Sequence, residues 1–217
     1  RSPHISKSAT LLWVTYCATA LSKASSWFST MTTSTNQKAV FLDRDGVINI
    51  DRGYVSQWSE FELLPGVVTA LADMQALGYR LIIVTNQSGI GRGFYTEGDF
   101  AALSTQLIDF LAGHDVQLTA IYHCPHHPTE AQGGFKKYCD CRKPQPGMVL
   151  RGVDDWQLEV EACALVGDKS SDIEAGRRAG IGHLFQVASE GEIEGDGVTS
   201  VTDLPGVVKY LTALAEQ

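Results

Sequence analysis

Two pairs of carboxylates stand directly after apolar stretches, at places where the strands of a sheet would end. Asp43 follows Ala-Val-Phe-Leu and Asp45 comes two residues later, while Asp168 follows Ala-Leu-Val-Gly and Asp172 comes four residues later. A carboxylate at the lip of a strand can act as a nucleophile. A second one nearby can give a proton to a leaving oxygen and take one from water. The pattern predicts phosphoryl transfer, with Asp43 as nucleophile and Asp45 as general acid and base.

Hydrogen-bond donors and cations suited to a phosphoryl group stand at two further element boundaries. Thr85 follows Leu-Ile-Ile-Val and can donate a hydrogen bond, and Lys143 can bring a positive charge to the equatorial phosphoryl oxygens. The clustered carboxylates would repel one another without a cation between them, and ligands that are all oxygen favour Mg²⁺. Lys169, next to Asp168, is expected to pair with the acidic cluster.

Two short pairs of metal-binding side chains bracket a loop rich in Cys, His, Pro and Gly: Cys124, His126, Cys139 and Cys141. Three thiolates and one imidazole form a tetrahedral zinc set, although His123 or His127 could supply the fourth ligand. Three local cysteines cannot all pair as disulfides. We therefore expect a structural zinc that pins the loop 124–141 and presents the two basic residues that follow it to the crevice. Cys163 lies in an apolar run and is expected in the core.

The elements that must position these residues alternate along the chain. Apolar runs predict strands at 38–43, 79–85, 119–124, 162–167 and 182–187. Helix signals predict helices at 65–77, 96–111, 146–156, 170–179 and about 204–215. Such alternation favours an α/β, doubly wound, mostly parallel sheet with helices on both faces. Ligands of such sheets bind at the carboxyl ends of the strands, where the candidate residues stand.

Length and charge narrow the class of protein. The 217 residues suit one domain, expected over 38–217. The chain has 17 basic and 25 acidic residues, a net charge of −8, which argues against a nucleic-acid partner. Apolar runs are too short for a membrane span. Residues 1–30 contain no acidic residue and are expected to be an extension outside the domain, either disordered or not native, with a targeting segment as the alternative. Reduced thiols favour the cytoplasm, and we expect a monomer.

The order of these motifs, D-x-D-G, then Thr, then Lys, then G-D-x-x-x-D, resembles the haloacid dehalogenase superfamily of aspartate-nucleophile phosphatases. The chain is particularly similar to the heptose bisphosphate phosphatases in the zinc-containing, minimally capped branch of that superfamily. The similar runs lie between residues 38 and 187, at 41–49, 53–55, 84–90, 122–128, 139–144 and 166–169.

The resemblance implies a role for individual residues. Asp43 would be the nucleophile, and Mg²⁺ would be bound by Asp43, the backbone carbonyl of Asp45, and Asp168. Zinc would be bound by Cys124, His126, Cys139 and Cys141. Substrate contacts would come from Asp51, Arg52, Gly53, Tyr54, Thr85, Asn86, Gln87, Ser88, Arg142, Lys143 and Lys169. The implied reaction removes the C7 phosphate of a heptose bisphosphate, in the synthesis of nucleotide-activated heptose for lipopolysaccharide.

The short distance between the first motif and the first predicted helix bears on specificity. The roughly twenty residues between Asp45 and Pro65 are too few for an ordinary cap domain, so we expect an open crevice. Arg142 is the candidate for gripping the second phosphate, because its planar fork can bind phosphate oxygens in pairs. Three other functions stay open: a histidinol-phosphate phosphatase, a nucleic-acid end phosphatase, and a zinc-stabilised binding module with an inert site.

Overall fold

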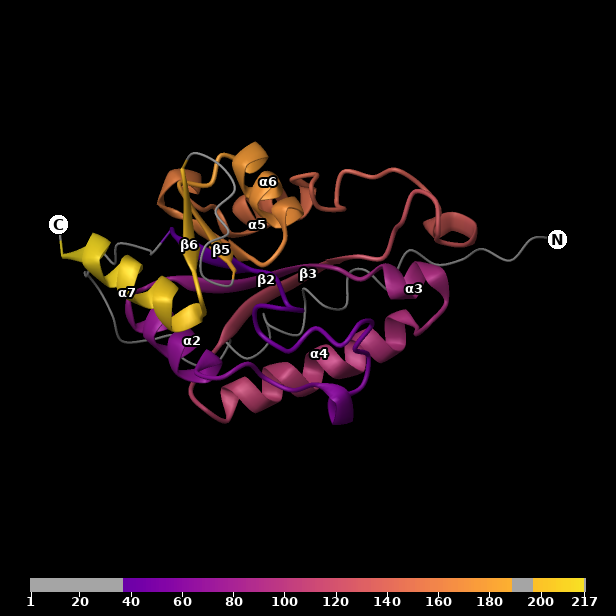
Figure 1. The fold of residues 1–217 in the computed structure, drawn as a ribbon, viewed down its shortest axis with the longest axis horizontal. Coiled ribbons are helices and arrows are strands. Elements are labelled where there is room, and N and C mark those ends of the chain that lie inside the picture. Colours follow the sequence, from indigo (N-terminus) through magenta and orange to yellow (C-terminus); the bar gives the residue numbers. More distant parts are fainter. Residues whose placement is uncertain (1–36, 189–196, 217) are drawn as a thin grey trace, which may run out of the picture. The chain divides into compact units, whose positions relative to one another are not determined.

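Six strands form one sheet in the order β3-β2-β1-β4-β5-β6 (Figure 1). Every neighbouring pair is parallel. The strands are β1 (Ala39–Leu42), β2 (Arg80–Asn86), β3 (Leu118–Cys124), β4 (Ala164–Gly167), β5 (His183–Val187) and β6 (Val198–Val201). This is a computed structural model, and it describes residues 37–188 and 197–216. The predicted extension 1–30 lies outside the described residues.

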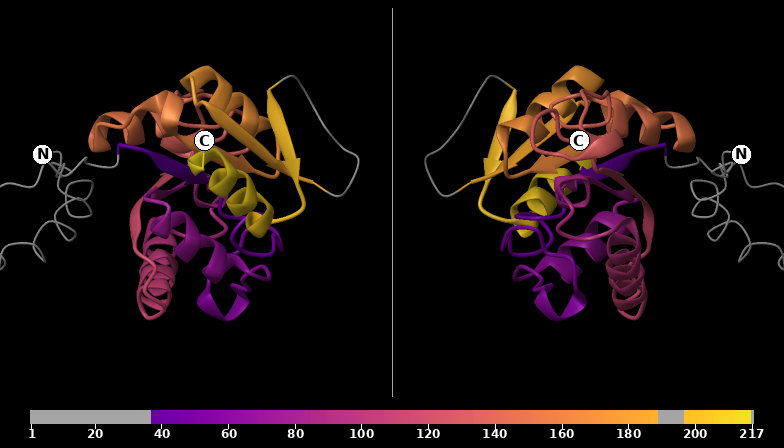
Figure 2. Two further views of the ribbon diagram at one scale, coloured as in Figure 1. Left: turned by 90° about the vertical axis from the view of Figure 1, so that its left-hand side faces the viewer. Right: turned by 90° about the vertical axis from the view of Figure 1, so that its right-hand side faces the viewer.

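Helices cover both faces of the sheet (Figure 2). One face carries α2 (Val67–Ala76), α4 (Glu97–Ala112) and α7 (Leu204–Ala215), and the other carries α5 (Gly147–Trp156) and α6 (Ser170–Ala179). Shorter elements are α3 (Ser88–Arg92) and the single turns η2 (Trp58–Glu60), η3 (Gly133–Phe135) and η4 (Val160–Ala162). No helix in the described part of the chain is long and apolar enough to cross a membrane.

The central strand β1 is buried on both sides because its side chains alternate between two cores. Val40 and Leu42 join the core beneath α2, α4 and α7, while Ala39 and Phe41 join the core beneath α5 and α6. All four residues of β1 are 0% exposed. A strand that is covered on both faces has apolar side chains at every position. The apolar run of β1 could therefore be recognised in the sequence.

Local signals also placed α4 correctly. The Thr96 side chain accepts a hydrogen bond from the backbone N–H of Asp99 at 3.1 Å, and the Asp99 carboxylate accepts one from the N–H of Thr96 at 2.8 Å. This reciprocal pair satisfies two backbone donors that a helix start leaves open. Phe100, Leu103, Leu107 and Leu111, which recur at helical spacing, are all buried.

The strand order reverses the winding direction of the chain within the sheet. From β1 the chain adds β2 and then β3 on one side. It then returns to the other side of β1 and adds β4, β5 and β6 in turn. In such sheets the ligand binds at the carboxyl ends of the strands, where the winding direction reverses. The reversal lies between β1 and β4, directly before Asp43 and Asp168.

Candidate active site

Three carboxylates meet where β1 and β4 end. The backbone N–H of Asp43 donates to the carbonyl of Val166 at 3.0 Å, so the β1–β4 pairing continues up to the first carboxylate. Asp43, Asp168 and Asp172 each bring an oxygen within 4.8 Å of the other two. Asp43 and Asp172 are buried. Without a positive charge among them, three such groups could not all remain ionised.

Lys143 supplies a positive charge inside this group. Its amine lies 2.9 Å from Oδ1 of Asp43 and 2.7 Å from Oδ1 of Asp172, and it donates to the carbonyl of Val84 at 2.8 Å. These three acceptors match the three N–H donors of an ammonium. Burial opposes the charge, but the two carboxylates outweigh it and raise the pKa of Lys143. Burial also raises the pKa of Asp43, against the pull of Lys143.

Asp172 acts as the partner of Lys143 in this geometry. Its Oδ1 receives the amine, and its Oδ2 accepts a hydrogen bond from the backbone N–H of Lys169 at 3.1 Å. Gly167 leaves room for it, because a Cβ there would lie 2.2 Å from the Asp172 Cβ. The sequence analysis listed Asp172 among the carboxylates of the site but assigned it no function. The four-residue spacing from Asp168, which puts it in the first turn of α6, was the available signal.

Asp168 is the carboxylate with capacity left for a cation. Its Oδ1 is buried and has no hydrogen-bond partner. Burial raises the pKa of Asp168 to about 6; Lys169 opposes the shift, while Asp43 and Asp172 add to it. Gly46, at φ +94°, passes so close that a Cβ would lie 2.4 Å from Oδ2 of Asp168. A partnerless buried oxygen beside a second carboxylate fits an oxygen-ligated divalent cation.

Asp45 lies in a network of donors instead of in the carboxylate group. Its oxygens accept hydrogen bonds from Arg44, Asn49 and Gln87. Gln87 also donates to the hydroxyl of Thr85 at 2.8 Å and accepts a hydrogen bond from the hydroxyl of Tyr95. The sequence missed Arg44, Asn49 and Tyr95, because nothing in their spacing shows that they converge on one carboxylate.

The loop after β1 carries exposed residues that reach the carboxylate group through Lys169. Asp51 accepts from Lys169 at 3.1 Å and from the N–H of Gly53 at 2.9 Å. Lys169 also lies 3.5 Å from Asp168, which agrees with the predicted pairing with the acidic cluster. Tyr54 is 45% exposed and has a positive φ of 57°, a rare conformation for a bulky residue. Arg52 pairs with Glu62 at the surface.

Other predicted substrate residues hold the chain in place. Asn86 makes two hydrogen bonds of 3.1 Å, to the N–H and the carbonyl of Lys143, and so fixes the backbone that carries the buried amine. Arg142 donates to the carbonyl of His126 at 3.1 Å. Ser88 is the first residue of α3 and is partly exposed.

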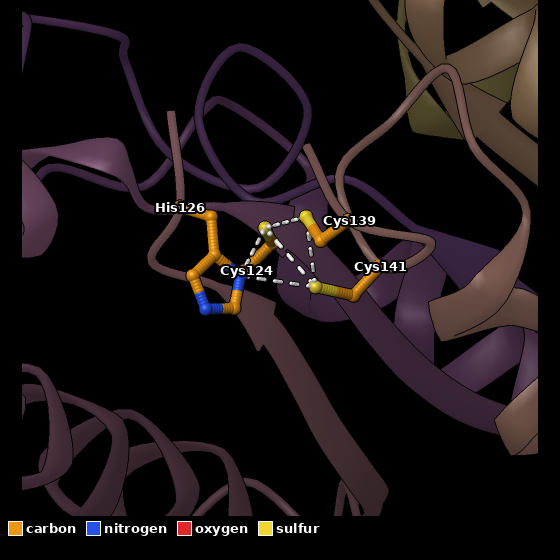
Figure 3. A group of neighbouring side chains, drawn as sticks. All are labelled: Cys124, His126, Cys139 and Cys141. Atoms are coloured by element: carbon orange, nitrogen blue, oxygen red, sulfur yellow. Dashed lines mark hydrogen bonds between the residues drawn. The ribbon is translucent and has the colours of Figure 1, made fainter. Parts of the chain in front are cut away.

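A second candidate metal centre lies beyond β3 (Figure 3). The three sulfurs and Nδ1 of His126 point toward one another, with separations of 3.3 Å to 3.6 Å for five of their six pairs. A tetrahedral zinc with bonds of about 2.3 Å places its sulfurs about 3.7 Å apart. The donor set and its spacing therefore fit zinc, and its members are Cys124, His126, Cys139 and Cys141.

The two alternative histidine ligands are engaged elsewhere. His123 pairs with Glu97 at 2.8 Å, and Nδ1 of His127 accepts from the backbone N–H of Glu130 at 3.0 Å. Hydrogen bonds from Cys124, Cys139 and His126 lower the pKa of Cys141, although burial opposes this. Cys163 is 0% exposed in the core, as predicted.

An aspartate after the first strand, a buried lysine and a carboxylate group fitted to a cation define a hydrolase of the aspartate-nucleophile class. The family model for haloacid dehalogenase-like hydrolases matches residues 19–180, and the chain belongs to that family. The match begins at residue 19, inside the predicted extension 1–30, whereas the structure describes the chain from residue 37.

Curated relatives narrow the comparison. D-glycero-beta-D-manno-heptose-1,7-bisphosphate 7-phosphatase of Salmonella typhi is 43% identical over 178 residues, covering 79% of this chain and 95% of that protein. The protein of that name from Escherichia coli (strain K12) is also 43% identical over 178 residues, covering 79% and 93%. The similarity to heptose bisphosphate phosphatases that the motifs indicated is confirmed. Because these relatives are named phosphatases, the chain is a phosphoric monoester hydrolase.

A solved structure of a heptose bisphosphate phosphatase is also similar to this chain. D,D-heptose 1,7-bisphosphate phosphatase from B. bronchiseptica, complexed with magnesium and phosphate, matches with a TM-score of 0.72 and 30% identity. The match covers 82% of this chain and 99% of that one. The predicted fold, a parallel doubly wound sheet with no large cap domain, is confirmed for the described residues.

Proposed function

We propose that this chain removes the C7 phosphate of D-glycero-β-D-manno-heptose 1,7-bisphosphate and leaves the heptose 1-phosphate. The observation that carries the proposal is the identity of 43% to phosphatases named for this substrate and position. The ion pair of Asp43 with Lys143 and the partnerless oxygen of Asp168 supply a site for the chemistry. We assign the reaction to the cytoplasmic synthesis of nucleotide-activated heptose for the lipopolysaccharide core.

The proposed nucleophile is Oδ2 of Asp43, because Oδ1 already binds Lys143 and the backbone N–H of Arg44. Oδ2 bonds to the phosphorus of the C7 phosphate. The bond from phosphorus to the C7 oxygen breaks, and that oxygen keeps the electron pair and takes a proton from Asp45. Water then attacks the aspartyl phosphate and gives a proton to Asp45. The bond to Asp43 breaks, its electron pair returns to the carboxylate, and phosphate leaves.

Charge on the transferring group is met by the surrounding side chains. We propose that Asp43, the backbone carbonyl of Asp45, and Asp168 hold Mg²⁺, which when bound would neutralise phosphoryl oxygens. Thr85 accepts a hydrogen bond from Gln87 and still has its own O–H to donate to one of those oxygens. Lys143 favours the ionised form of Asp43 and orients its carboxylate. All three N–H groups of Lys143 already have protein acceptors, so its role is to position Asp43.

Substrate selection is assigned to the loops. We propose that zinc holds the loop 124–141 and so sets the position of Arg142, which is fixed on one side by the carbonyl of His126. The guanidinium would then bind the C1 phosphate through its planar fork. Asp51 and Tyr54 lie on the loop after β1, and Lys169, which follows β4, pairs with Asp51; all three are proposed to contact the sugar.

The test is phosphate release, with Mg²⁺ present, from heptose 1,7-bisphosphate and from histidinol phosphate. We expect strong preference for the heptose, with phosphorus NMR showing that the C1 phosphate remains. Asp43→Asn should abolish the activity, while Asp73→Asn, the same change at an exposed position of α2, should not alter it. Preference for histidinol phosphate, or release that survives Asp43→Asn, would contradict the proposal.

The other two candidate functions predict different results with the same purified protein. Salt-dependent binding of DNA, with release of terminal phosphate, would indicate a nucleic-acid end phosphatase. A folded, zinc-containing protein with no phosphatase activity on either substrate would indicate a binding module.

A further inference from the structure

Arg44, the residue between the two aspartates of the first motif, is buried with its charge. Its side chain is 3% exposed. The guanidinium lies 5.9 Å from the ring centre of Phe61 and 5.8 Å from that of Phe100, and Nη2 donates to the carbonyl of Val55 at 2.9 Å. Burying a guanidinium among aromatic rings is costly unless a partner compensates it.

The compensating partner is Asp45. Nε of Arg44 donates to Oδ2 at 3.1 Å, while Nη2 donates to Oδ1 at 3.0 Å and to Oδ2 at 2.9 Å. This two-pronged contact fixes the direction of the carboxylate plane, which a single point charge such as a lysine amine could not do.

Two further side chains complete the setting of Asp45. Asn49, which is 0% exposed, donates to Oδ1 at 3.0 Å, and Gln87, which is 2% exposed, donates to Oδ2 at 3.0 Å. Each oxygen therefore receives donors from two directions, and the oxygen that carries the proton in the first step gives up one of these contacts. Gln87 also donates to Thr85, so the network that orients Asp45 reaches the residue at the end of β2.

We propose that Arg44 is a positioning residue, which aims the carboxyl group of Asp45 at the oxygen that leaves phosphorus. This inference rests on the proposed role of Asp45 as proton donor, and Arg44 itself does not touch the substrate. In the first step the phosphorus–oxygen bond breaks, the electron pair goes to the leaving oxygen, and the proton of Asp45 moves to that oxygen. A misdirected Asp45 slows this step only where the leaving oxygen needs a proton.

The experiment compares two substrates that differ in this need. An alkyl phosphate such as heptose 1,7-bisphosphate releases a basic oxygen, whereas p-nitrophenyl phosphate releases an anion that is stable without a proton. The parameter is kcat/KM, which reports the steps up to departure of the leaving group. We expect Arg44→Met to lower kcat/KM for the heptose about tenfold to a hundredfold and to leave that for p-nitrophenyl phosphate within about twofold.

Arg44→Lys keeps the positive charge but loses the two-pronged guanidinium contact with Asp45. This variant is measured in addition because Arg44→Met could fail to fold. Arg44→Lys should show the same selective loss at a smaller size. In the background of Asp45→Asn, Arg44→Lys should cost nothing further, because the group that it positions is gone. Equal losses on both substrates, or losses that multiply with Asp45→Asn, would show a merely structural role and overturn the inference.

The outcome separates this inference from the proposed substrate. If the wild-type protein hydrolyses histidinol phosphate and not the heptose, the proposed function fails. The same comparison then runs with histidinol phosphate as the alkyl substrate. A selective loss there would support the positioning role of Arg44, and an equal loss would overturn it.

Discussion

Lys143 and Asp43 form an ion pair of 2.9 Å in which the side chains are only 2% and 7% exposed. The two residues come from different parts of the chain, the loop after Cys141 and the end of β1. Their pairing determines which oxygen of Asp43 stays available for other contacts, because the amine and the N–H of Arg44 both bind Oδ1.

Lys143→Met should therefore disable the protein in two ways. Removing the amine leaves the buried carboxylates of Asp43 and Asp172 without the positive charge that they share, which lowers the free energy of unfolding by about 3–5 kcal/mol. The rate of phosphate release should fall at least about a hundredfold. Lys169→Met is the control in denaturant unfolding, because its side chain is 54% exposed and the expected loss is below about 1 kcal/mol. Equal losses of stability in the two variants would contradict the structure.

Binding of Mg²⁺ should weaken as the pH falls through about 6. Burial raises the pKa of Asp168 from its ordinary 3.8 to this value. The metal-free fold therefore holds the proton more tightly than the unfolded chain does. The ionised form destabilises that fold at neutral pH, a penalty that disappears below the ordinary pKa. Because Mg²⁺ needs the carboxylate, its apparent Kd should rise about tenfold per pH unit below the raised pKa.

Calorimetric titration with Mg²⁺ at about pH 7.5 and about pH 5 measures this dependence. Asp168→Asn should bind Mg²⁺ weakly at both values. A wild-type Kd that stays constant over the range would show that Asp168 is not a ligand.

Gly46→Ala should damage the Mg²⁺ site, whereas Gly53→Ala should not. Both glycines have a positive φ, of 94° and 74°, so each substitution costs about 1–2 kcal/mol of backbone strain. The new Cβ of Gly46→Ala would lie 2.4 Å from Oδ2 of Asp168, while that of Gly53→Ala meets nothing within 4 Å. Mg²⁺ titration separates the two, and equal affinities would show that Asp168 moves aside at no cost.

Loss of zinc should lower activity through the segment that follows the ligands. Cys139→Ser should reduce zinc content and thermal stability, because the loop then lacks its cross-link. Activity should fall because Arg142 and Lys143 directly follow Cys141. Metal analysis and a thermal melt measure both effects. Cys163→Ala, at a buried cysteine outside the cluster, should keep the zinc. Full activity in a zinc-free Cys139→Ser protein would contradict the coupling.

Much of the fold was predictable because its elements carry local signals. β1 and β4 are apolar runs, and the capping pair Thr96 and Asp99 marks the start of α4. The missed elements lack such signals. α3 has five residues, two of them glycine, and β6 is a four-residue strand at the edge of the sheet with only partly buried side chains. Their conformations depend on what packs against them.

The candidate site was predictable as a set of residues, and its internal pairing was not. Strand ends pointed to Asp43, Thr85 and Asp168, and the short spacing of the Cys and His pairs pointed to the zinc cluster. The partnership of Lys143 with Asp172 and the burial of Arg44 against Asp45 arise only when distant segments dock. No periodicity or spacing in the chain encodes such contacts.

The position of β1 between β2 and β4 has a consequence for synthesis of the protein. Asp43, the proposed nucleophile, is among the earliest residues of the described domain, yet its partners Lys143, Asp168 and Asp172 come from the second half. A nascent chain that has completed β1, β2 and β3 already holds Asp43 beside an unfilled sheet position. Until β4 and α6 leave the ribosome and dock there, that carboxylate lacks the neighbouring Asp168 and Asp172, and the amine of Lys143 lacks its second carboxylate. The chain therefore gains its reactive centre late, when almost the whole domain has folded around it.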